Sequence, residues 1–253
     1  MLHLSHTTIA ILFAAACFGG FVDAIAGGGG MITIPALLSV GIPPHLALGT
    51  NKLQGCFGSL TAALNYRRTK LVKLRETVLG VGFTAVGAFA GTRFVQVLAP
   101  QLLSHLIPAM LLVLLIYMLL NPKIGSGARE ARIGSSLFYI LFGLMIGFYD
   151  GFFGPGTGTI WTLAFAIWLG FDLKRSTAYT KMMNFTSNAV SALVFGLGGN
   201  VLVLAGVVMG VGQMLGAYLG SHLVLKRGTR FVRVFSLAVM TITTAKLLWL
   251  QYH

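Results

Sequence analysis

The sequence is short of charge, and of acidic residues in particular. Of its 253 residues, 5 are Asp or Glu and 18 are Lys or Arg, so charged residues make up 9% of the chain. A soluble globular domain carries about 25%. Because hydrophobic residues reach 56%, so few charges cannot cover a surface that faces water. We therefore expect this chain to face lipid.

Cysteine and clustered histidine are also lacking. The two cysteines, Cys17 and Cys56, lie inside apolar runs without metal-ligand spacing, and the six histidines are scattered. These absences argue against a disulfide framework and a metal site, and we expect no cofactor. A membrane enzyme or assembly factor would need a metal cluster or an activated nucleophile, so we regard it as the weaker alternative.

The net charge of +13 does not indicate a nucleic-acid partner, because the basic residues lie in short connectors between apolar runs. The connectors at 67–75, 123–132, 174–175 and 226–233 hold 14 of the 18 basic residues. Basic connectors of membrane proteins lie on the cytoplasmic side. This pattern predicts a multi-pass protein of a bacterial inner membrane, with both termini in the periplasm.

Apolar runs along the chain predict helices of two kinds. A bilayer-spanning helix needs about 20 residues, and eight runs approach or exceed that length, whereas two shorter runs follow glycine-rich breaks. Irregular backbone at membrane depth must be buried in protein or line a cavity. The long runs are 7–26, 45–66, 76–98, 102–120, 134–153, 176–197, 201–224 and 232–251, and the short ones are 31–41 and 159–170.

The glycine-rich breaks belong to a repeated pattern. The sequence Gly20-Phe21-Val22-Asp23 precedes the glycines at 27–30, and Gly147-Phe148-Tyr149-Asp150 precedes the glycine-rich segment 154–158. The basic connectors orient the two halves in opposite directions. We therefore predict an all-α polytopic membrane protein of two inverted repeats, residues 1–122 and 123–253, with eight long transmembrane helices and two short Gly-interrupted half-helices. Secondary transporters are commonly built this way, with the binding site at the breaks.

Two lysines lie inside the apolar helices rather than in connectors. Lys52 and Lys181 each come about two turns into a long helix, at nearly equivalent places in the two halves. A charge at that depth costs several kcal/mol unless it is paired or hydrated, which favours a role in binding an anion. The alternative is that both lysines reach out to the membrane interface, as we expect of Arg93 and Lys246.

Polar residues and glycines surround the two lysines. Hydrogen-bonding side chains would contact the substrate, and the half-helices after the breaks would add backbone N–H groups at helix starts, which favour anions. Polar residues that only hold helices together, and glycines that only permit close packing, are the alternatives. The candidate substrate-binding residues are Asn51, Lys52, Gln54, Lys181, Asn184, Thr186, Ser187, Asn188, Gly29, Gly30, Gly156 and Gly158.

The acids inside the apolar runs are Asp23 and Asp150, and each directly precedes its glycine-rich break. An intramembrane carboxylate is a candidate for proton coupling. It could equally pair with a lysine, or cap the start of a neighbouring helix. The sequence does not separate these three roles.

Three segments, Gly20–Pro35, Ala47–Gly55 and Tyr179–Asn188, resemble the TauE/SafE family of sulfite-exporter-type membrane proteins. The resemblance covers nearly the whole chain. It implies secondary transport of small sulfur-containing anions, such as sulfite, sulfoacetate or related organic sulfonates, across a bacterial inner membrane. A passive anion channel that uses the same residues is the alternative. The sequence leaves the substrate, the direction, the coupling ion and the oligomeric state open.

Overall fold

The fold is described from a computed structural model of the chain, which describes residues 5–68, 71–120, 130–226 and 241. Within these residues every regular element is an α-helix, and the chain is an all-α polytopic membrane protein, as its composition predicts. The helices are α1 (His6–Ala26), α2 (Gly30–Ser39), α3 (Pro44–Arg68), α4 (Leu74–Gln96), α5 (Pro100–Leu120), α6 (Ser135–Phe152), α7 (Thr157–Trp168), α8 (Leu173–Leu197) and α9 (Val203–Lys226).

The helices that the apolar runs predict agree with the described ones within three residues at each end. The expected helix at 232–251 lies outside the described residues, so the total of eight long helices stays a prediction. Four described segments are long and apolar enough to cross a membrane: His6–Ile25, Leu74–Gln96, Ser135–Phe152 and Val203–Leu223. Helices α3 and α8 are as long but more polar, because they carry the intramembrane lysines and amides.

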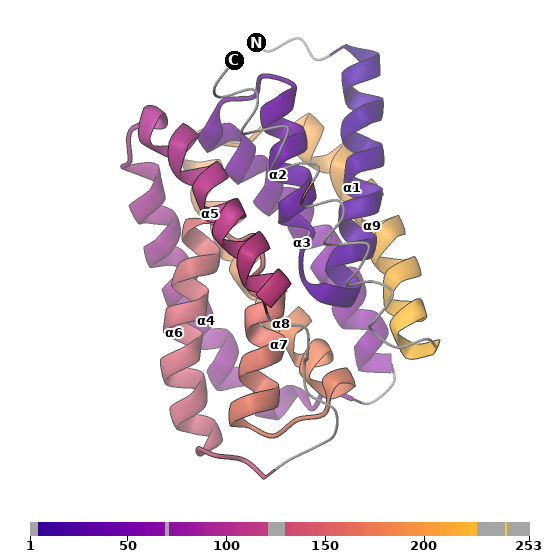
Figure 1. Cartoon of the computed structure of the whole chain (residues 1–253), viewed down its shortest axis with the longest axis vertical. Coiled ribbons are helices and arrows are strands. Elements are labelled where there is room, and N and C mark those ends of the chain that lie inside the picture. The colour runs from indigo at the N-terminus through magenta and orange to yellow at the C-terminus, as the bar shows by residue number, and fades with distance from the viewer. Residues whose placement is uncertain (1–4, 69–70, 121–129, 227–240, 242–253) are drawn as a thin grey trace.

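Helices α3 and α8 pack against each other in the middle of the bundle, and the apolar helices flank them (Figure 1). Helix α1 packs along α9 on one side, and α4 packs along α6 on the other. If α1 corresponds to α6 and α4 corresponds to α9, the α1–α9 contact is equivalent to the α6–α4 contact. In Figure 1, α1 runs downward from the upper end of the view toward the middle of the bundle, whereas α6 runs upward. This correspondence supports our proposal that the halves are inverted repeats.

Hydrogen bonds at opposite ends of the bundle follow the same correspondence. The backbone N–H of Leu202, before α9, donates to the hydroxyl of Thr50 at 3.0 Å. The backbone N–H of Lys73, before α4, donates to the hydroxyl of Tyr179 at 3.3 Å. In both cases a hydroxyl near the start of a central helix, α3 or α8, accepts a hydrogen bond from the residue just before a flanking helix, α9 or α4. Helices α3 and α8 therefore begin at opposite ends of the bundle.

Glycines let the flanking helix pairs approach closely. A Cβ atom added to Gly216 of α9 would lie 1.8 Å from the carbonyl oxygen of Cys17 in α1, and one added to Gly91 of α4 would lie 2.0 Å from the carbonyl oxygen of Phe148 in α6. Small residues at such contacts are how membrane helices gain van der Waals packing, since lipid supplies no hydrophobic drive between them.

Alanine at two glycines of α4 is expected to have opposite effects. Gly91→Ala places a methyl group against backbone that cannot yield, and overpacking costs about 1–3 kcal/mol. A Cβ at Gly82 meets nothing within 4 Å, so Gly82→Ala stabilises the helix by about 1 kcal/mol through propensity. Reversible unfolding in mixed micelles measures both variants. Equal effects at the two positions would contradict the close α4–α6 packing.

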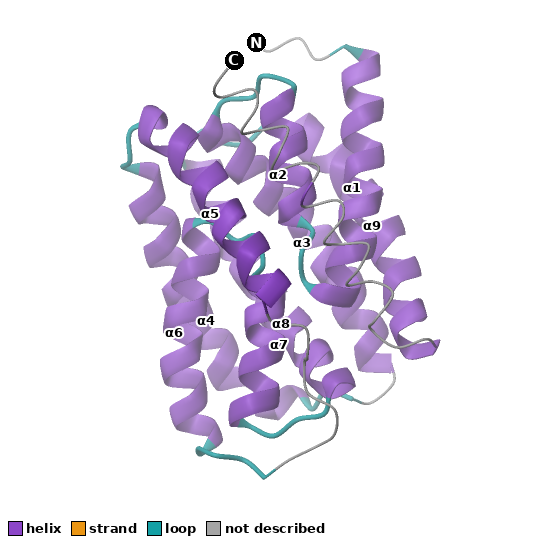
Figure 2. Ribbon diagram, in the orientation of Figure 1, coloured by secondary structure: helices purple, strands orange, loops and turns teal. Residues whose placement is uncertain are grey.

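Each short helix follows a longer one after a short glycine-rich break: α2 follows α1, and α7 follows α6. Helix α1 ends at Gly27, whose φ of 74° closes the last turn, and α7 starts after Gly156, whose φ is 80°. Both conformations are left-handed and favour glycine. Figure 2 shows the two breaks as loop segments in the middle of the bundle, with α2 above them and α7 below. Each half-helix therefore extends from the centre of the bundle toward a different end.

Candidate functional site

The two glycine-rich breaks touch each other at the centre of the molecule. A Cβ atom on Gly27 would lie 2.3 Å from the Cα atom of Gly158, and a Cβ atom on Gly158 would lie 2.3 Å from the Cα atom of Gly27. Only glycine permits such a backbone approach at both positions. The contact brings the end of α1 and the start of α7 to one point, which is also where the intramembrane charges gather.

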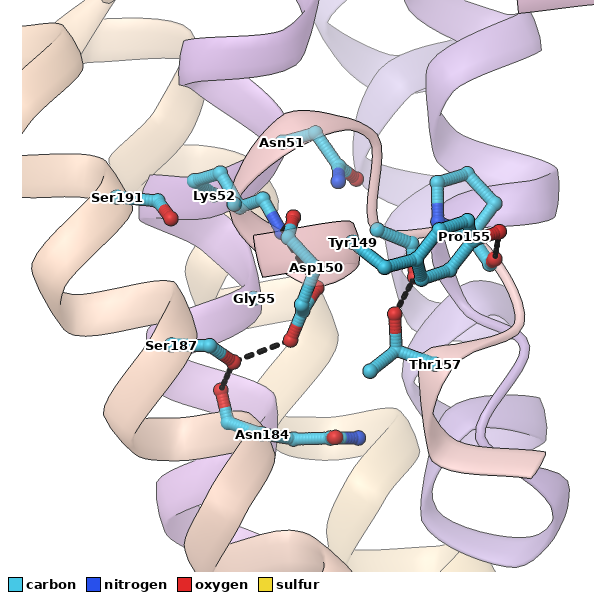
Figure 3. Close-up of polar contacts among 12 residues, drawn as sticks. Asn51, Lys52, Gly55, Tyr149, Asp150, Pro155, Thr157, Asn184, Ser187 and Ser191 are labelled. Carbon is cyan, nitrogen blue, oxygen red and sulfur yellow. Dashed lines mark hydrogen bonds and ion pairs between the residues drawn. The ribbon is translucent and has the colours of Figure 1, made fainter. Parts of the chain in front are cut away.

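Lys52 of α3 reaches from the first half of the chain to α6 in the second. Its side chain is 2% exposed, and its Nζ lies 2.6 Å from Oδ1 of Asp150. The ammonium also donates to the backbone carbonyl of Asp150, which belongs to the last turn of α6. The lysine thereby caps the C-terminal end of a broken helix, where a positive charge is favourable. Ser187 donates to Oδ2 of the same carboxylate (Figure 3).

Lys181 of α8 repeats this arrangement in the opposite direction. Its side chain is 0% exposed, and its Nζ lies 2.9 Å from Oδ2 of Asp23. It also donates to the backbone carbonyl of Asp23, in the last turn of α1. The other carboxylate oxygen, Oδ1, accepts from the backbone N–H of Gly29 at 3.4 Å. Each ion pair therefore links one half of the chain to the other.

The buried positions of the lysines exclude the alternative that they extend to the membrane interface. Both Lys52 and Lys181 rank among the largest fully buried side chains of the described residues. Arg93, in contrast, is exposed at the end of α4, and Lys246 lies outside the described residues. Of the three roles that the sequence left open for Asp23 and Asp150, pairing with a lysine is the one that the geometry of both carboxylates displays.

A small polar cavity lies between the ion pairs and the breaks, with a volume of about 30 Å³. One buried water needs about 10–15 Å³ on this measure, so the cavity has room for about two waters. Nine of the residues predicted for the site line it: Asp23, Gly29, Gly30, Asn51, Lys52, Asp150, Gly158, Asn184 and Asn188.

Among the described residues, Asn51 and Asn184 each keep one amide atom free to form a further hydrogen bond at the cavity. Oδ1 of Asn51 accepts from the Thr33 hydroxyl at 2.5 Å and from Nε2 of Gln54 at 2.9 Å, which leaves the Asn51 amide nitrogen beside Gly30. Asn184 is 5% exposed, and its Oδ1 has no hydrogen-bond partner within the described part of the chain. This oxygen accepts hydrogen bonds, so it is open to a donor such as a water in the cavity and not to another acceptor.

The other predicted residues stand behind the cavity wall or away from it. Lys181, Gln54 and Ser187 hold Asp23, Asn51 and Asp150 in place. Gly156 is the residue before α7. The Thr186 hydroxyl donates to the carbonyl oxygen of Met182 at 2.9 Å, within its own helix, so the structure does not bring Thr186 to the cavity.

Five residues outside the candidate list also line the cavity: Gly27, Gly154 and Thr157, which belong to the predicted breaks, and Gly55 and Gln213. A Cβ atom on Gly154 would lie 2.6 Å from Nζ of Lys52, and one on Gly55 would lie 3.0 Å from Nδ2 of Asn188. Both glycines therefore make room for a functional side chain. Gln213 is a buried amide inside the apolar run of α9, and such an isolated polar residue is a signal that could have identified it.

Comparison with known proteins places the chain among transporters. The family model described as "Sulfite exporter TauE/SafE" matches residues 12–247. The chain belongs to this family. The TauE/SafE resemblance of the three sequence segments is thereby confirmed. Since the match spans both glycine-rich breaks and both lysines, the site described above lies entirely within the family region.

Curated relatives carry compatible names. A "Probable membrane transporter protein YfcA" of Escherichia coli K12 is 42% identical over 246 residues, which cover 97% of this chain and 91% of the relative. A "Probable membrane transporter protein" of Haemophilus influenzae is 43% identical over 243 residues, covering 96% and 95%. YdhB of Bacillus subtilis, named in the same way, is 26% identical over 216 residues, covering 84% and 87%. No solved structure matches the chain significantly.

These comparisons establish the general activity of this TauE/SafE family member. It is a membrane transporter of a small molecule and not an enzyme, because the family and the relatives are described as exporters or membrane transporters. The prediction of membrane transport from the intramembrane lysines and interrupted helices is thus confirmed at this level.

Proposed function

We propose that this chain is a secondary transporter of small anions in the bacterial inner membrane, with sulfite, sulfoacetate and related organic sulfonates as the substrate class. The observation that carries the proposal is a pair of fully buried lysines, Lys52 and Lys181, contributed by the two halves to one polar site. Burying two ammonium groups in a membrane protein is costly. Binding an anion is a function that accounts for this cost.

The chemistry of the site suits an oxyanion. A sulfite or sulfonate group presents three oxygens that accept hydrogen bonds and carries a negative charge. The cavity offers the ammonium group of Lys52 and the amides of Asn51, Asn184 and Asn188. Helices α2 and α7 start at its wall, with Gly30 and Thr157, and helix starts attract anions.

The small cavity indicates that the structure represents a closed state. A group of three oxygens around sulfur needs more space than the two waters that fit here. Enlarging the site requires the two halves to move apart, and the Lys52–Asp150 and Lys181–Asp23 pairs are the polar links between them at this point. Alternating access by movement of one repeat against the other would open and re-form these links in turn.

We also propose the orientation of the chain in the membrane. Helix α3 ends with the exposed residues Arg67 and Arg68, and exposed Lys73 and Arg75 follow just before and in the first turn of α4. Basic connectors face the cytoplasm, so this end of the bundle would be cytoplasmic. Since α1 begins at the other end, the N-terminus would lie in the periplasm, and the C-terminus would lie there also.

Anion exchange in proteoliposomes tests the proposed function. Vesicles loaded with sulfite, sulfate, sulfoacetate, methanesulfonate or acetate are diluted into labelled anion, and we expect exchange of the sulfur oxyanions by the wild type. Lys52→Met combined with Lys181→Met should abolish exchange, because the anion then has no buried positive charge to meet. Arg93→Met, which removes an exposed cation, should keep it. Wild-type exchange in the double lysine variant would refute the assignment.

The same vesicles separate a coupled transporter from a passive channel. A channel dissipates an anion gradient and cannot accumulate the anion against one, whatever pH gradient is imposed. A secondary transporter coupled to an ion accumulates its substrate when that ion gradient is applied. Accumulation driven by an imposed pH gradient therefore favours a transporter, and rapid electrogenic flux without accumulation favours a channel.

A further inference from the structure

The formal charges at the site sum to zero. Lys52 and Lys181 contribute two positive charges, and Asp23 and Asp150 contribute two negative ones. The helix ends also balance, because α1 and α6 end where α2 and α7 begin, and each end carries a partial charge of about one half. A monovalent anion that enters this balanced site would leave one buried, uncompensated negative charge, which is strongly unfavourable.

We propose that the anion binds together with a proton, which Asp23 takes up. This inference rests on the proposed anion transport and names its coupling ion. A hydronium ion of the aqueous phase transfers a proton to a carboxylate oxygen of Asp23: its O–H bond breaks, a new O–H bond forms on the carboxylate, which becomes a neutral carboxylic acid, and water is left. Lys181 loses its counter-ion at 2.9 Å and can face the anion instead. A monovalent anion then enters without changing the net charge of the site.

The surroundings of the two carboxylates differ in a way that selects Asp23. Asp150 receives donors on both oxygens, Lys52 on Oδ1 and Ser187 on Oδ2, and its side chain is 5% exposed. Donors to the charged form hold a carboxylate ionised. Asp23 receives Lys181 on Oδ2, but only the backbone N–H of Gly29 at 3.4 Å on Oδ1.

The asymmetry has a simple origin in the sequence. Gly58 occupies the position of the first half that corresponds to Ser187, so no hydroxyl is available there for Asp23. In its place Gly58 faces the amide of Gln213. The side chain of Asp23 is also 19% exposed, so water has access to it that Asp150 lacks. Asp23 is therefore the carboxylate placed to exchange a proton.

Apart from the two charged lysines, the titratable groups around the carboxylates are tyrosines and a cysteine, which are neutral near pH 7 because their ordinary pKa values are about 10 and about 8.5. Helices α2, α4, α7 and α9 present backbone, hydroxyl or amide groups to this region rather than charges. The charged and titratable groups that face Asp23 or Asp150 from the packed helices are Lys52, Cys56 and Tyr66 of α3, Tyr149 of α6 and Lys181 of α8. The proton is thus assigned to an aspartate and not to a neighbour.

Calorimetry on the purified full-length protein tests the coupling directly. Methanesulfonate, which keeps one negative charge at all relevant pH values, is titrated into protein at pH 7 in two buffers of different ionisation enthalpy. We expect uptake of about one proton for each anion bound, and therefore binding about tenfold weaker for each pH unit of increase.

Variants identify the group that takes the proton. Asp23→Asn should bind methanesulfonate with proton uptake close to zero, because its side chain is already neutral. In vesicles it should exchange anions but lose accumulation driven by a pH gradient. Asp172→Asn is the matched control, because Asp172 is an exposed acid that caps α8 and Asn caps equally well. It should retain wild-type proton uptake.

The possible results separate this inference from the function on which it rests. If the wild type neither binds nor exchanges any sulfur oxyanion, the proposed function is overturned. If the wild type exchanges anions but binds methanesulfonate without proton uptake, the coupling is overturned while anion transport stands. Wild-type proton uptake by Asp23→Asn would transfer the role away from Asp23. The wild-type calorimetry tests the coupling without any variant. The coupling can therefore be overturned even if the Asp23→Asn protein does not fold.

Discussion

Lys52→Met is expected to lower the free energy of unfolding by about 3–5 kcal/mol, because removing one partner of a buried ion pair leaves the other charge uncompensated. Here the stranded group is the carboxylate of Asp150, whose side chain is 5% exposed. Combining Lys52→Met with Asp150→Leu should recover most of that loss, since an apolar pair of similar volume is often as stable as a buried ion pair. Unfolding in mixed micelles measures the effects of the single and double variants.

The double variant separates the structural from the functional role of Lys52. We expect it to fold with near wild-type stability and to show no anion exchange, because the lysine that would contact the anion is gone. Lys73→Met provides a control. Lys73 pairs with Glu76 at 3.3 Å, but its side chain is 74% exposed, so we expect a change of at most about 1 kcal/mol. A double variant that transports normally would show that the ion pair only supports the fold.

Gly27→Ala is expected to separate the two helix breaks and abolish transport. The new Cβ would lie 2.3 Å from the Cα atom of Gly158, and backbone on both sides prevents a local adjustment. The residue would also be strained, since its φ is 74°. We expect a loss of about 1–3 kcal/mol from overpacking in addition to the strain of a left-handed residue, which is about 1–2 kcal/mol.

Gly41→Ala isolates the two contributions. Its φ of 82° is similar, but a Cβ there meets nothing within 4 Å. Gly41→Ala should therefore show the strain alone and keep anion exchange, so the difference between the variants measures the contact between the breaks. Unfolding and exchange assays on both proteins give this difference. Equal stability losses with intact exchange in Gly27→Ala would mean that the breaks need not touch.

The charge arrangement accounts for how a small anion site can exist in a bilayer. Lys52 and Lys181 are each held by the carboxylate and the backbone carbonyl of an aspartate at the end of a broken helix. Each ammonium is therefore satisfied when the site is empty, and the carboxylate occupies the place that an anion would take. Binding then becomes an exchange of one anionic partner for another, which requires less charge separation than filling a site of bare lysines.

The sequence predicted the helices and their breaks because both depend on local properties. Apolar runs of membrane-spanning length, and glycines such as Gly27 and Gly156 with left-handed backbone, define where a helix can continue and where it ends. The depth of Lys52 and Lys181 in their helices was also visible, since it follows from spacing along one element. The family resemblance added the general activity, which the comparisons confirm.

Side-chain contacts between distant segments could not be obtained this way. Three roles were open for Asp23 and Asp150, and only the tertiary arrangement brings each acid, at the end of α1 or α6, to a lysine of the other half. The direction of the Thr186 hydroxyl toward its own helix depends on which face of α8 meets α3. The contribution of Gln213 depends on how α9 packs beside α3.

By itself, the sequence determined that this chain lies in a membrane, where its helices are interrupted, and that two cations are buried within them, because these properties follow from hydropathy, glycine and local spacing. The tertiary structure decided which charges neutralise each other, which amides face the cavity, and that Asp23 and Asp150 have unequal surroundings. Those features depend on distances between segments far apart in the sequence, such as Lys181 and Asp23, and local sequence preferences do not encode such distances.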